Sequence, residues 1–202
     1  SDQDDIWDAD KLERAVTWLN SVSKNVPALY CSRTRLIDET GSHTGESCFF
    51  NRKKSFANAL VQNIAGGNTM VFNHAAMLLL RECKENHFGV MHDWWTYIVV
   101  SGCGGVVFYD TKPSLSYRQH ANNAIGANSS FAARLTRVRQ MRHGRFKNWN
   151  DANIMAMSKI QEKLTLQNRV TLTLFARARQ MGLLPRRVYM LRSGVFRQTF
   201  LG

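Results

Sequence analysis

The sequence has few cysteines, and no two of them are close together. Its four cysteines, Cys31, Cys48, Cys83 and Cys103, include no Cys-x-x-Cys pair. Structural zinc sites and the disulfide frameworks of small secreted proteins both need closely spaced cysteines. The spacing therefore indicates neither, and we expect a protein of the reducing cytoplasm.

Long hydrophobic runs are also missing. The most apolar stretch, residues 97–108, contains several glycines, whereas a membrane-spanning helix needs about 20 apolar residues. The first residues show no basic segment followed by an apolar one, so they predict no secretion signal. They also lack an initiator methionine, and we therefore expect the chain to be a piece of a longer protein.

Acidic residues are scarce in the last third of the chain. Residues 130–202 contain 15 lysines and arginines but only Asp151 and Glu162, a net charge of +13. Residues 1–129 contain 12 basic and 13 acidic residues. This change in charge predicts two parts, 1–129 and a basic region 130–202. No internal repeat appears.

Helical and strand patterns alternate in the first part. A helix is predicted after Asp10, with Asp10 and Glu13 as a capping box and an apolar face of Leu12, Ala15, Val16 and Leu19. Further helices are predicted over 56–63, over 75–83 (capped by Asn73), and from His92 or Asp93 to the glycine-rich residues 102–105 that would end it. Strands are predicted over 27–32, 70–72, 106–110 and 114–120. Residues 38–47 read as a polar loop, and residues after 130 as helices. The alternation predicts an α/β layer structure.

The first residues crowd four carboxylates, Asp2, Asp4, Asp5 and Asp8, just before a predicted helix. A helix start needs only one capping side chain, and like charges so close together repel each other. Asp2 and Asp4 form a D-x-D pattern whose oxygens suit Mg²⁺ or Mn²⁺. The alternative is a set of solvated acids that merely precede a helix.

Two other segments contain side chains suited to chemistry. In His92-Asp93-Trp94-Trp95, a carboxylate at a helix start beside two large aromatics could serve as a general base, or Asp93 could be a helix cap with both tryptophans in the core. In the segment 117–123, Arg118 could bind phosphate oxygens and His120 could bind a metal, or both could belong to a solvated strand end.

Four segments taken in order resemble the family 2 glycosyltransferases, especially their bacterial rhamnosyltransferase-like branch. They are SDQDDIW (1–7), NALVQNIAGGNTMVFN (58–73), MHDWWTYIVVSGCGGVVFYD (91–110) and SLSYRQHANNAIGA (114–127); SGVFRQTFLG (193–202) is also similar to that branch. The resemblance implies a GT-A, Rossmann-like α/β fold. Residues 1–129 would be its metal- and acceptor-binding half, the nucleotide-binding half would precede residue 1, and residues 130–202 would be a basic, mostly helical tail.

The same resemblance implies an activity and a set of site residues. A sugar, with rhamnose from dTDP-rhamnose as a candidate, would pass with inversion from a nucleotide-sugar donor to a glycan or lipid-linked acceptor in surface polysaccharide synthesis. Asp93 would be the catalytic base, and Mg²⁺ or Mn²⁺ would be bound by Asp2, Asp4 and His120, with Asp5 orienting them. Donor and acceptor would be bound by Gly66, Gly67, Asn68, Trp94, Trp95, Arg118 and Gln119. A chain without the nucleotide-binding half is expected to be inactive on its own.

This branch more often has glycine where the chain has Ala121, and the Gln-x-x-Arg-Trp motif of other family 2 enzymes is absent. Both departures bear on the roles given to residues around Arg118, at the side of the leaving diphosphate.

Three further interpretations concern binding partners. The basic region could bind nucleic acid, although it lacks interleaved aromatics. Asp2, Asp4 and His120 could instead serve a metal-dependent phosphohydrolase. We favour a peripheral contact with the cytoplasmic face of an anionic membrane and no nucleic acid. The apolar residues predicted to contact this membrane are Leu172, Phe175, Leu183 and Leu184. The basic residues predicted to contact it are Arg177, Arg179, Arg186 and Arg187.

Overall fold

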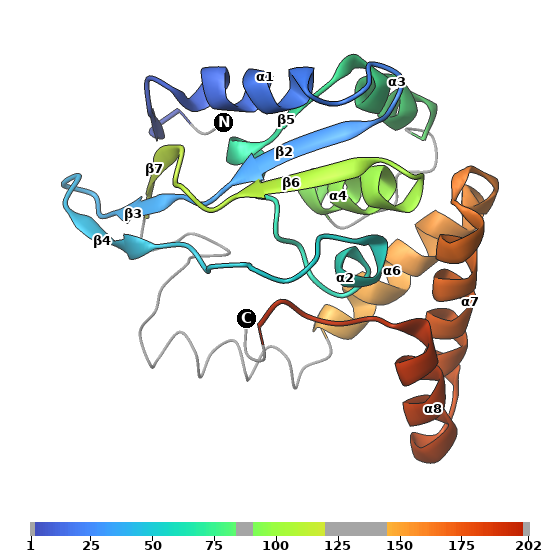
Figure 1. Cartoon of the computed structure of the whole chain (residues 1–202). Helices are drawn as coiled ribbons and strands as arrows, with labels where there is room; N and C mark the ends of the chain where they lie inside the picture. The colour runs from blue at the N-terminus through green and yellow to red at the C-terminus, as the bar shows by residue number, and fades with distance from the viewer. Residues whose placement is uncertain (1–2, 84–90, 120–144, 200–202) are drawn as a thin grey trace.

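The structure, a computed structural model, describes residues 3–83, 91–119 and 145–199. Figure 1 shows two small β-sheets with helices around them. The strands are β1 (Ile6–Trp7), β2 (Ala28–Ser32), β3 (Arg35–Ile37), β4 (His43–Glu46), β5 (Val71–Phe72), β6 (Val106–Asp110) and β7 (Leu115–Arg118). The helices are α1 (Lys11–Asn20), α2 (Phe56–Ala59), α3 (His74–Glu82), α4 (His92–Gly102), α6 (Arg145–Lys159), α7 (Leu166–Gln180) and α8 (Leu183–Ser193). The α/β prediction is confirmed.

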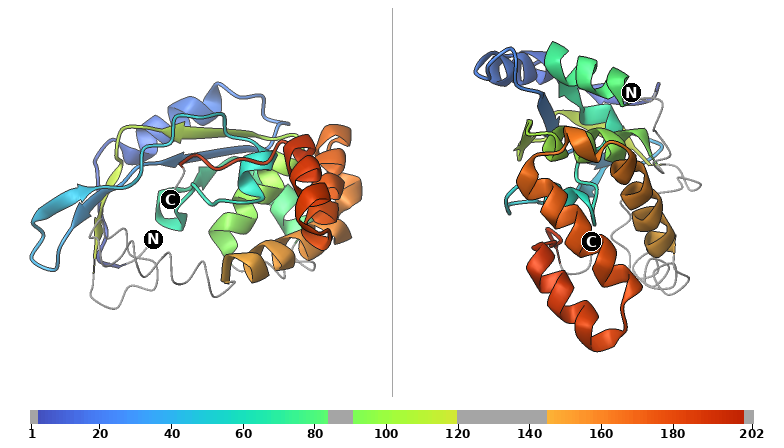
Figure 2. Two further views of the ribbon diagram at one scale, coloured as in Figure 1. Left: turned by 90° about the horizontal axis from the view of Figure 1, so that it is seen from below. Right: turned by 90° about the vertical axis from the view of Figure 1, so that its right-hand side faces the viewer.

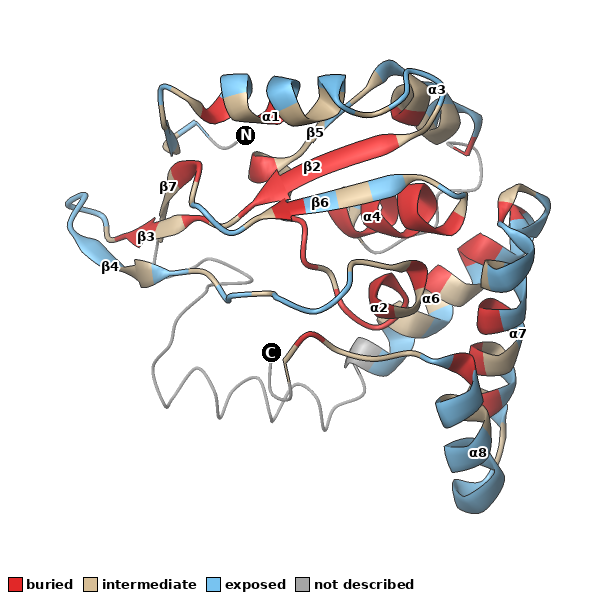
Figure 3. Cartoon of the chain, viewed as in Figure 1, coloured by how far each residue is buried: buried red, intermediate tan, exposed pale blue. Residues whose placement is uncertain are grey.

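The first sheet has the strand order β5-β2-β6, with β2 parallel to β6 and antiparallel to β5. All five residues of β2 are buried, as expected for a short apolar run without alternation that is covered on both faces. In Figure 1, α1 and α3 lie above this sheet and α4 and α2 lie below it. Figure 3 shows the resulting buried layer in β2 and α4. The strands predicted at 27–32, 70–72 and 106–110 are therefore confirmed.

The second sheet has the order β1-β7-β3-β4. Its β3–β4 hairpin occupies part of the segment 38–47, so the prediction of a loop there is wrong for residues 43–46. The physical reason is that β4 is almost entirely exposed and forms through backbone pairing with β3, which leaves no apolar signal in its sequence. The two-residue strand β1, which pairs with β7, was not predicted either.

Helix α1 forms where it was predicted, but its start and its buried face differ. The Asp10 side chain caps no backbone amide; its carboxylate contacts Lys112 and Arg14 instead, so the capping box is wrong. Leu12 and Val16 on the predicted apolar face are each about half exposed, at 50% and 47%. The buried positions are Ala15 and, unexpectedly, Lys11.

The other predicted helices of the first part are present. The Asn73 side chain accepts a hydrogen bond from Ala76 N at 3.0 Å, which confirms the predicted cap of α3. Helix α4 begins at His92 and ends at Gly102, as predicted. Helix α2 is shorter than predicted and ends at Ala59.

The helices of the basic region share one hydrophobic core with α2 and α4. Phe56 of α2 and Tyr97 of α4 belong to the same buried cluster as Met157 of α6 and Phe175 of α7. The predicted boundary at residues 129/130 lies outside the described residues. Within the described part of the chain, no helix is both long and apolar enough to cross a membrane.

Candidate functional site

A tight turn over residues 66–69 brings two of the sequence motifs together. Thr69 N and Thr69 Oγ1 both donate to Gly66 O, at 2.9 and 2.8 Å, which closes the short helix η1 (Gly67–Thr69). Gly67 lies directly against the start of α4: a Cβ added to it would be 2.8 Å from His92 Nε2 and 3.6 Å from Asp93 Cβ. Only glycine therefore fits here without displacing the His92 side chain.

The next residue, Asn68, connects this turn to the acidic segment. Its Nδ2 donates to Asp5 Oδ2 at 3.0 Å, and its backbone oxygen accepts from Lys11 Nζ at 2.7 Å. Asp5 follows directly after the D-x-D pattern. The turn thus touches the acidic segment on one side and the predicted base, Asp93, on the other.

Lys11 is a buried residue beside the candidate site that the sequence analysis did not single out. It is only 2% exposed, and its ammonium group lies 3.4 Å from the centre of the Trp7 ring. Burial lowers the pKa of Lys11 to about 8, against an opposing effect of the Asp5 charge. One signal could have indicated it, because a lysine in the first turn of a helix opposes the helix dipole.

Asp93 occupies the first turn of α4 and is 8% exposed. Its Oδ1 accepts a hydrogen bond from Trp94 N at 2.7 Å. None of the described residues donates a hydrogen bond to its Oδ2. The positive end of the helix dipole favours a carboxylate at this position. Asp93 therefore has one oxygen fixed by the backbone and another available to a bound hydroxyl group.

Trp94 and Trp95 lie in the core, each 3% exposed. The Trp94 indole donates to Ala59 O at 2.6 Å and packs edge-on against Trp149 of α6. Both rings therefore pack beside the start of α4, and their role in binding donor or acceptor stays a prediction.

Arg118 and Gln119 lie at and just after the end of β7. The Arg118 guanidinium donates to Asp38 O and Glu39 O, at 3.1 and 2.8 Å, and so holds the turn between β3 and β4. Gln119 N donates to Ile37 O, and its side-chain Nε2 is buried without a partner among the described residues. Gln119 thus has a donor group available for an anion or a hydroxyl.

The predicted metal ligands can be compared only in part. Asp2 and His120 lie outside the described residues, and Asp4 is half-buried beside Asp5. Over residues 3–83, 91–119 and 145–199, no three His, Cys, Asp or Glu side chains are grouped as a metal would require. The oxygen donors of the acidic segment fit a hard divalent cation in their chemistry.

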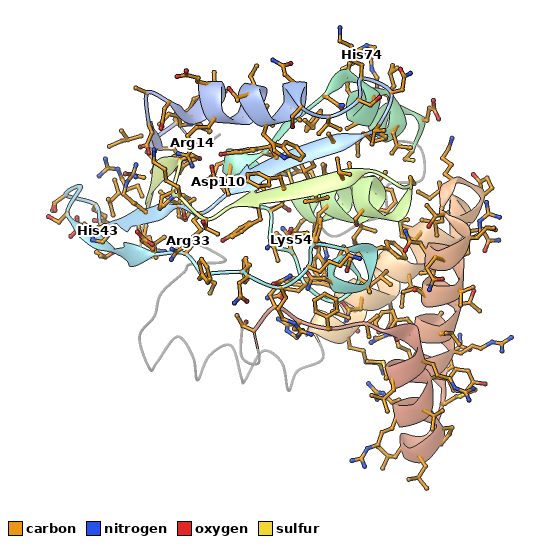
Figure 4. All side chains as sticks on the ribbon, in the orientation of Figure 1. Arg14, Arg33, His43, Lys54, His74 and Asp110 are labelled. Carbon is orange, nitrogen blue, oxygen red and sulfur yellow. The ribbon has the colours of Figure 1, made fainter. Side chains whose placement is uncertain are left out.

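A second polar cluster fixes α1 to the end of β6. Asp110 Oδ2 accepts from Arg14 Nε at 3.1 Å; Figure 4 labels both residues. It also accepts from the Tyr30 hydroxyl at 2.6 Å. Burial alone would raise the pKa of Asp110, but these hydrogen bonds outweigh it and hold the pKa below its ordinary value. The cluster positions α1, and with it Lys11, over the first sheet.

Comparison with known proteins gives one informative match. The chain is 32% identical over 154 residues to the dTDP-rhamnosyl transferase RfbG of Shigella flexneri, a match that covers 71% of this chain and 50% of that protein. The chain therefore spans about half the length of this relative. No family model and no solved structure matches the chain. The resemblance indicated by the four motifs is confirmed: the chain is similar to a bacterial rhamnosyltransferase over most of its length.

Proposed function

We propose that the intact protein transfers a sugar from a nucleotide-sugar donor to a hydroxyl group of a glycan or lipid-linked acceptor, in the synthesis of a surface polysaccharide. The name of the Shigella relative makes dTDP-rhamnose the first donor to test. The observation that carries the proposal is the turn 66–69, because it contacts both Asp5 and the start of α4 at Asp93.

In this proposal Asp93 is the general base. Its Oδ2 takes the proton of the acceptor hydroxyl while the hydroxyl oxygen bonds to the anomeric carbon. The bond from that carbon to the diphosphate breaks, and its electron pair leaves with the diphosphate. Attack from the opposite face inverts the configuration. The bond from Trp94 N holds Oδ1 and so fixes the direction of Oδ2.

The leaving diphosphate needs positive charge or hydrogen-bond donors. Asp2 and Asp4, with His120 as a third ligand, would hold Mg²⁺ or Mn²⁺, which would neutralise the developing charge. Asp5 would orient this segment through Asn68. Gln119, the residue before His120, offers a buried amide donor. Arg118 already donates hydrogen bonds to the backbone of residues 38–39. The backbone of Gly66 and Gly67 would line the acceptor side of the site, where Gly67 lies against His92 and Asp93.

The proposal is tested by incubating the intact protein with dTDP-rhamnose and a glycan acceptor, with and without EDTA. We expect acceptor-dependent release of dTDP that EDTA abolishes and Mg²⁺ or Mn²⁺ restores. Metal-dependent hydrolysis of generic phosphoesters, with no acceptor-dependent release of dTDP, would indicate a phosphohydrolase, the second candidate. Tight DNA binding with no release of dTDP would favour the nucleic-acid interpretation of the basic region.

A further inference from the structure

Helix α8 exposes large apolar side chains that the rest of the described chain does not cover. Leu184 and Leu191 are 78% and 82% exposed, and Val188 between them is 48% exposed. Their spacing of four and three residues places them on one face of the helix. Leu183, beside them at the tip of the α7–α8 hairpin, is 82% exposed. Burying leucines is worth about 1.5–3 kcal/mol each, so such a row indicates a partner surface.

Arginines flank this apolar row. Arg187 and Arg192 lie on α8 on either side of the row and are exposed, whereas Arg186, also exposed, lies two residues from Leu184 and so on nearly the opposite face of the helix. No acidic residue follows Glu162 in the sequence, so nothing on α8 or after it neutralises them. A shallow groove of about 440 Å³ runs along the helix, lined by Leu183, Arg186, Arg187, Met190 and Leu191. The face is thus apolar at its centre and cationic at its edges.

The hairpin projects beyond the rest of the described chain. Figures 1 and 2 show α7 and α8 extending away from both sheets, with the tip at residues 181–183 farthest out. In Figure 3, α8 is mostly in the exposed colour, in contrast to α4. A flat surface could therefore approach α8 without contacting the sheets.

We propose that α8 is a membrane-contacting helix that lies on an anionic lipid surface, with Leu183, Leu184, Val188 and Leu191 in the acyl boundary and Arg187 and Arg192 at the headgroups. Amphipathic helices with leucines on one face and arginines beside them bind in this way, through buried apolar area and attraction to anionic lipid. Such a contact would keep the protein at a membrane without a spanning helix.

Two other occupants of this face fit less well. A second copy of α8 would bring the arginines of both helices close together with no acidic residue to separate them, and like charges repel. A nucleic acid would meet aliphatic leucines at the centre of the face, where sequence-tolerant single-strand binding uses stacked aromatic rings.

The structure also corrects the membrane surface that the sequence predicted. Leu172 and Phe175 are buried in the core, at 4% and 1% exposure, so they are wrong as membrane contacts. Arg179 is also wrong, because its guanidinium is bonded to Asp151 at 2.5 Å. Arg177 is exposed but lies on α7, and Arg186 lies on the other face of α8. Leu183, Leu184 and Arg187 remain, and Val188, Leu191 and Arg192 join them.

The test is co-sedimentation of the intact protein with vesicles of phosphatidylcholine alone and of phosphatidylcholine mixed with phosphatidylglycerol. We expect binding only to the anionic vesicles, weakening as salt is added. Each arginine near the surface should contribute about fivefold in affinity, so the double change R187Q/R192Q should weaken binding by about 25-fold. L184S/L191S should also abolish sedimentation, because it removes two apolar side chains of the membrane-contacting face. Both leucines are exposed, so the change should leave the core intact.

Matched controls separate this face from general charge and hydrophobicity. K24Q/K53Q/R81Q removes three exposed basic residues elsewhere, and L166S removes a leucine that is 79% exposed at the far end of α7. Both should bind like the parent. Equal loss in these controls, equal binding to neutral vesicles, concentration-dependent dimerisation lost in L184S/L191S, or binding to DNA but not to vesicles would each overturn the proposal. The assay needs no sugar transfer, so its result is independent of the proposed activity.

Discussion

At the scale of the residue, Lys11 shows how the candidate site is held together. A buried ammonium group is unfavourable unless it is paired, and Lys11 finds the Asn68 carbonyl oxygen, the Trp7 ring and the nearby Asp5 charge. Through Asn68 it fixes the turn that lies against Asp93. We therefore regard Lys11 as a positioning residue of the site.

This role predicts a dependence of stability on pH. The pKa of Lys11 in the folded chain is about 8, below the ordinary lysine value of 10.5. Between these two values the unfolded chain holds more protons than the folded chain, so raising the pH favours folding. The free energy of unfolding of the parent should therefore rise relative to that of Lys11→Met from pH 8 to pH 10.

Chemical denaturation of both proteins at several pH values measures this difference. Burial also raises the pKa values of cysteines and tyrosines, but their contributions to the free energy of unfolding cancel because both proteins contain them. A difference that stays constant from pH 7 to pH 10 would mean that Lys11 titrates as an ordinary exposed lysine.

At the scale of the element, glycines determine where helix α4 ends and strand β6 begins. A Cβ at Gly105 would lie 2.6 Å from Pro27 O and 2.7 Å from Val100 O, both backbone atoms that cannot move independently. The backbone of Gly105 donates to Val100 O at 2.9 Å, and Val106 N donates to Pro27 O at 2.8 Å. This close approach starts the parallel pairing of β2 with β6.

Gly105→Ala should therefore destabilise the chain by about 1–3 kcal/mol, the usual cost of overpacking. Gly182→Ala is the matched control, because no atom lies within 4 Å of its added Cβ; as the N-cap of α8 it should cost less than about 1 kcal/mol. Thermal unfolding of both variants compares them. An equal effect in the two would show that Gly105 has more space than its neighbours indicate.

At the scale of the whole molecule, hydrogen bonds connect the segment after α8, residues 194–199, to the first part of the chain. Gln198 Nε2 donates to Arg52 O, Lys53 O and Asn58 Oδ1, and its Oε1 accepts from Arg52 N. Its backbone amide donates to Gln62 Oε1 at 2.6 Å. Because Asn58 also accepts from the Tyr97 hydroxyl, this network reaches α4.

Gln198→Ala should lower the free energy of unfolding by about 2–4 kcal/mol, since it leaves several buried polar groups unpaired. Gln180→Ala, at an exposed position of α7, should change it by less than about 0.5 kcal/mol. Denaturant titration of both variants would show the difference. A loss in Gln198→Ala no larger than in the control would mean that the C-terminal segment contributes nothing to the fold.

The sequence predicts those features of the molecule that depend on local patterns. The Asn73 cap, the buried run of β2 and the limits of α4 all follow from neighbouring residues. Features that depend on distant partners were missed. Strand β4 forms through its pairing with β3, which the sequence of β4 does not indicate. The Asp10 carboxylate accepts a hydrogen bond from Lys112 and does not cap the helix.

The candidate site divides in the same way. The motifs pointed to Asn68 and Asp93, but the bond from Asn68 to Asp5 and the burial of Lys11 required the three-dimensional structure.

The central claim, that Asp93 is the base of a glycosyl-transfer site, is tested most directly by Asp93→Asn in the intact protein. An amide cannot accept the hydroxyl proton, so transfer from dTDP-rhamnose should fall by about 10²–10⁴-fold. Binding of the donor, measured by calorimetry, and the unfolding midpoint should stay close to those of the parent. Asp151→Asn, which alters an exposed carboxylate paired with Arg179, should transfer sugar at the parent rate. Transfer by Asp93→Asn within a few-fold of the parent would contradict the account and leave Asp93 as a residue of the helix start alone.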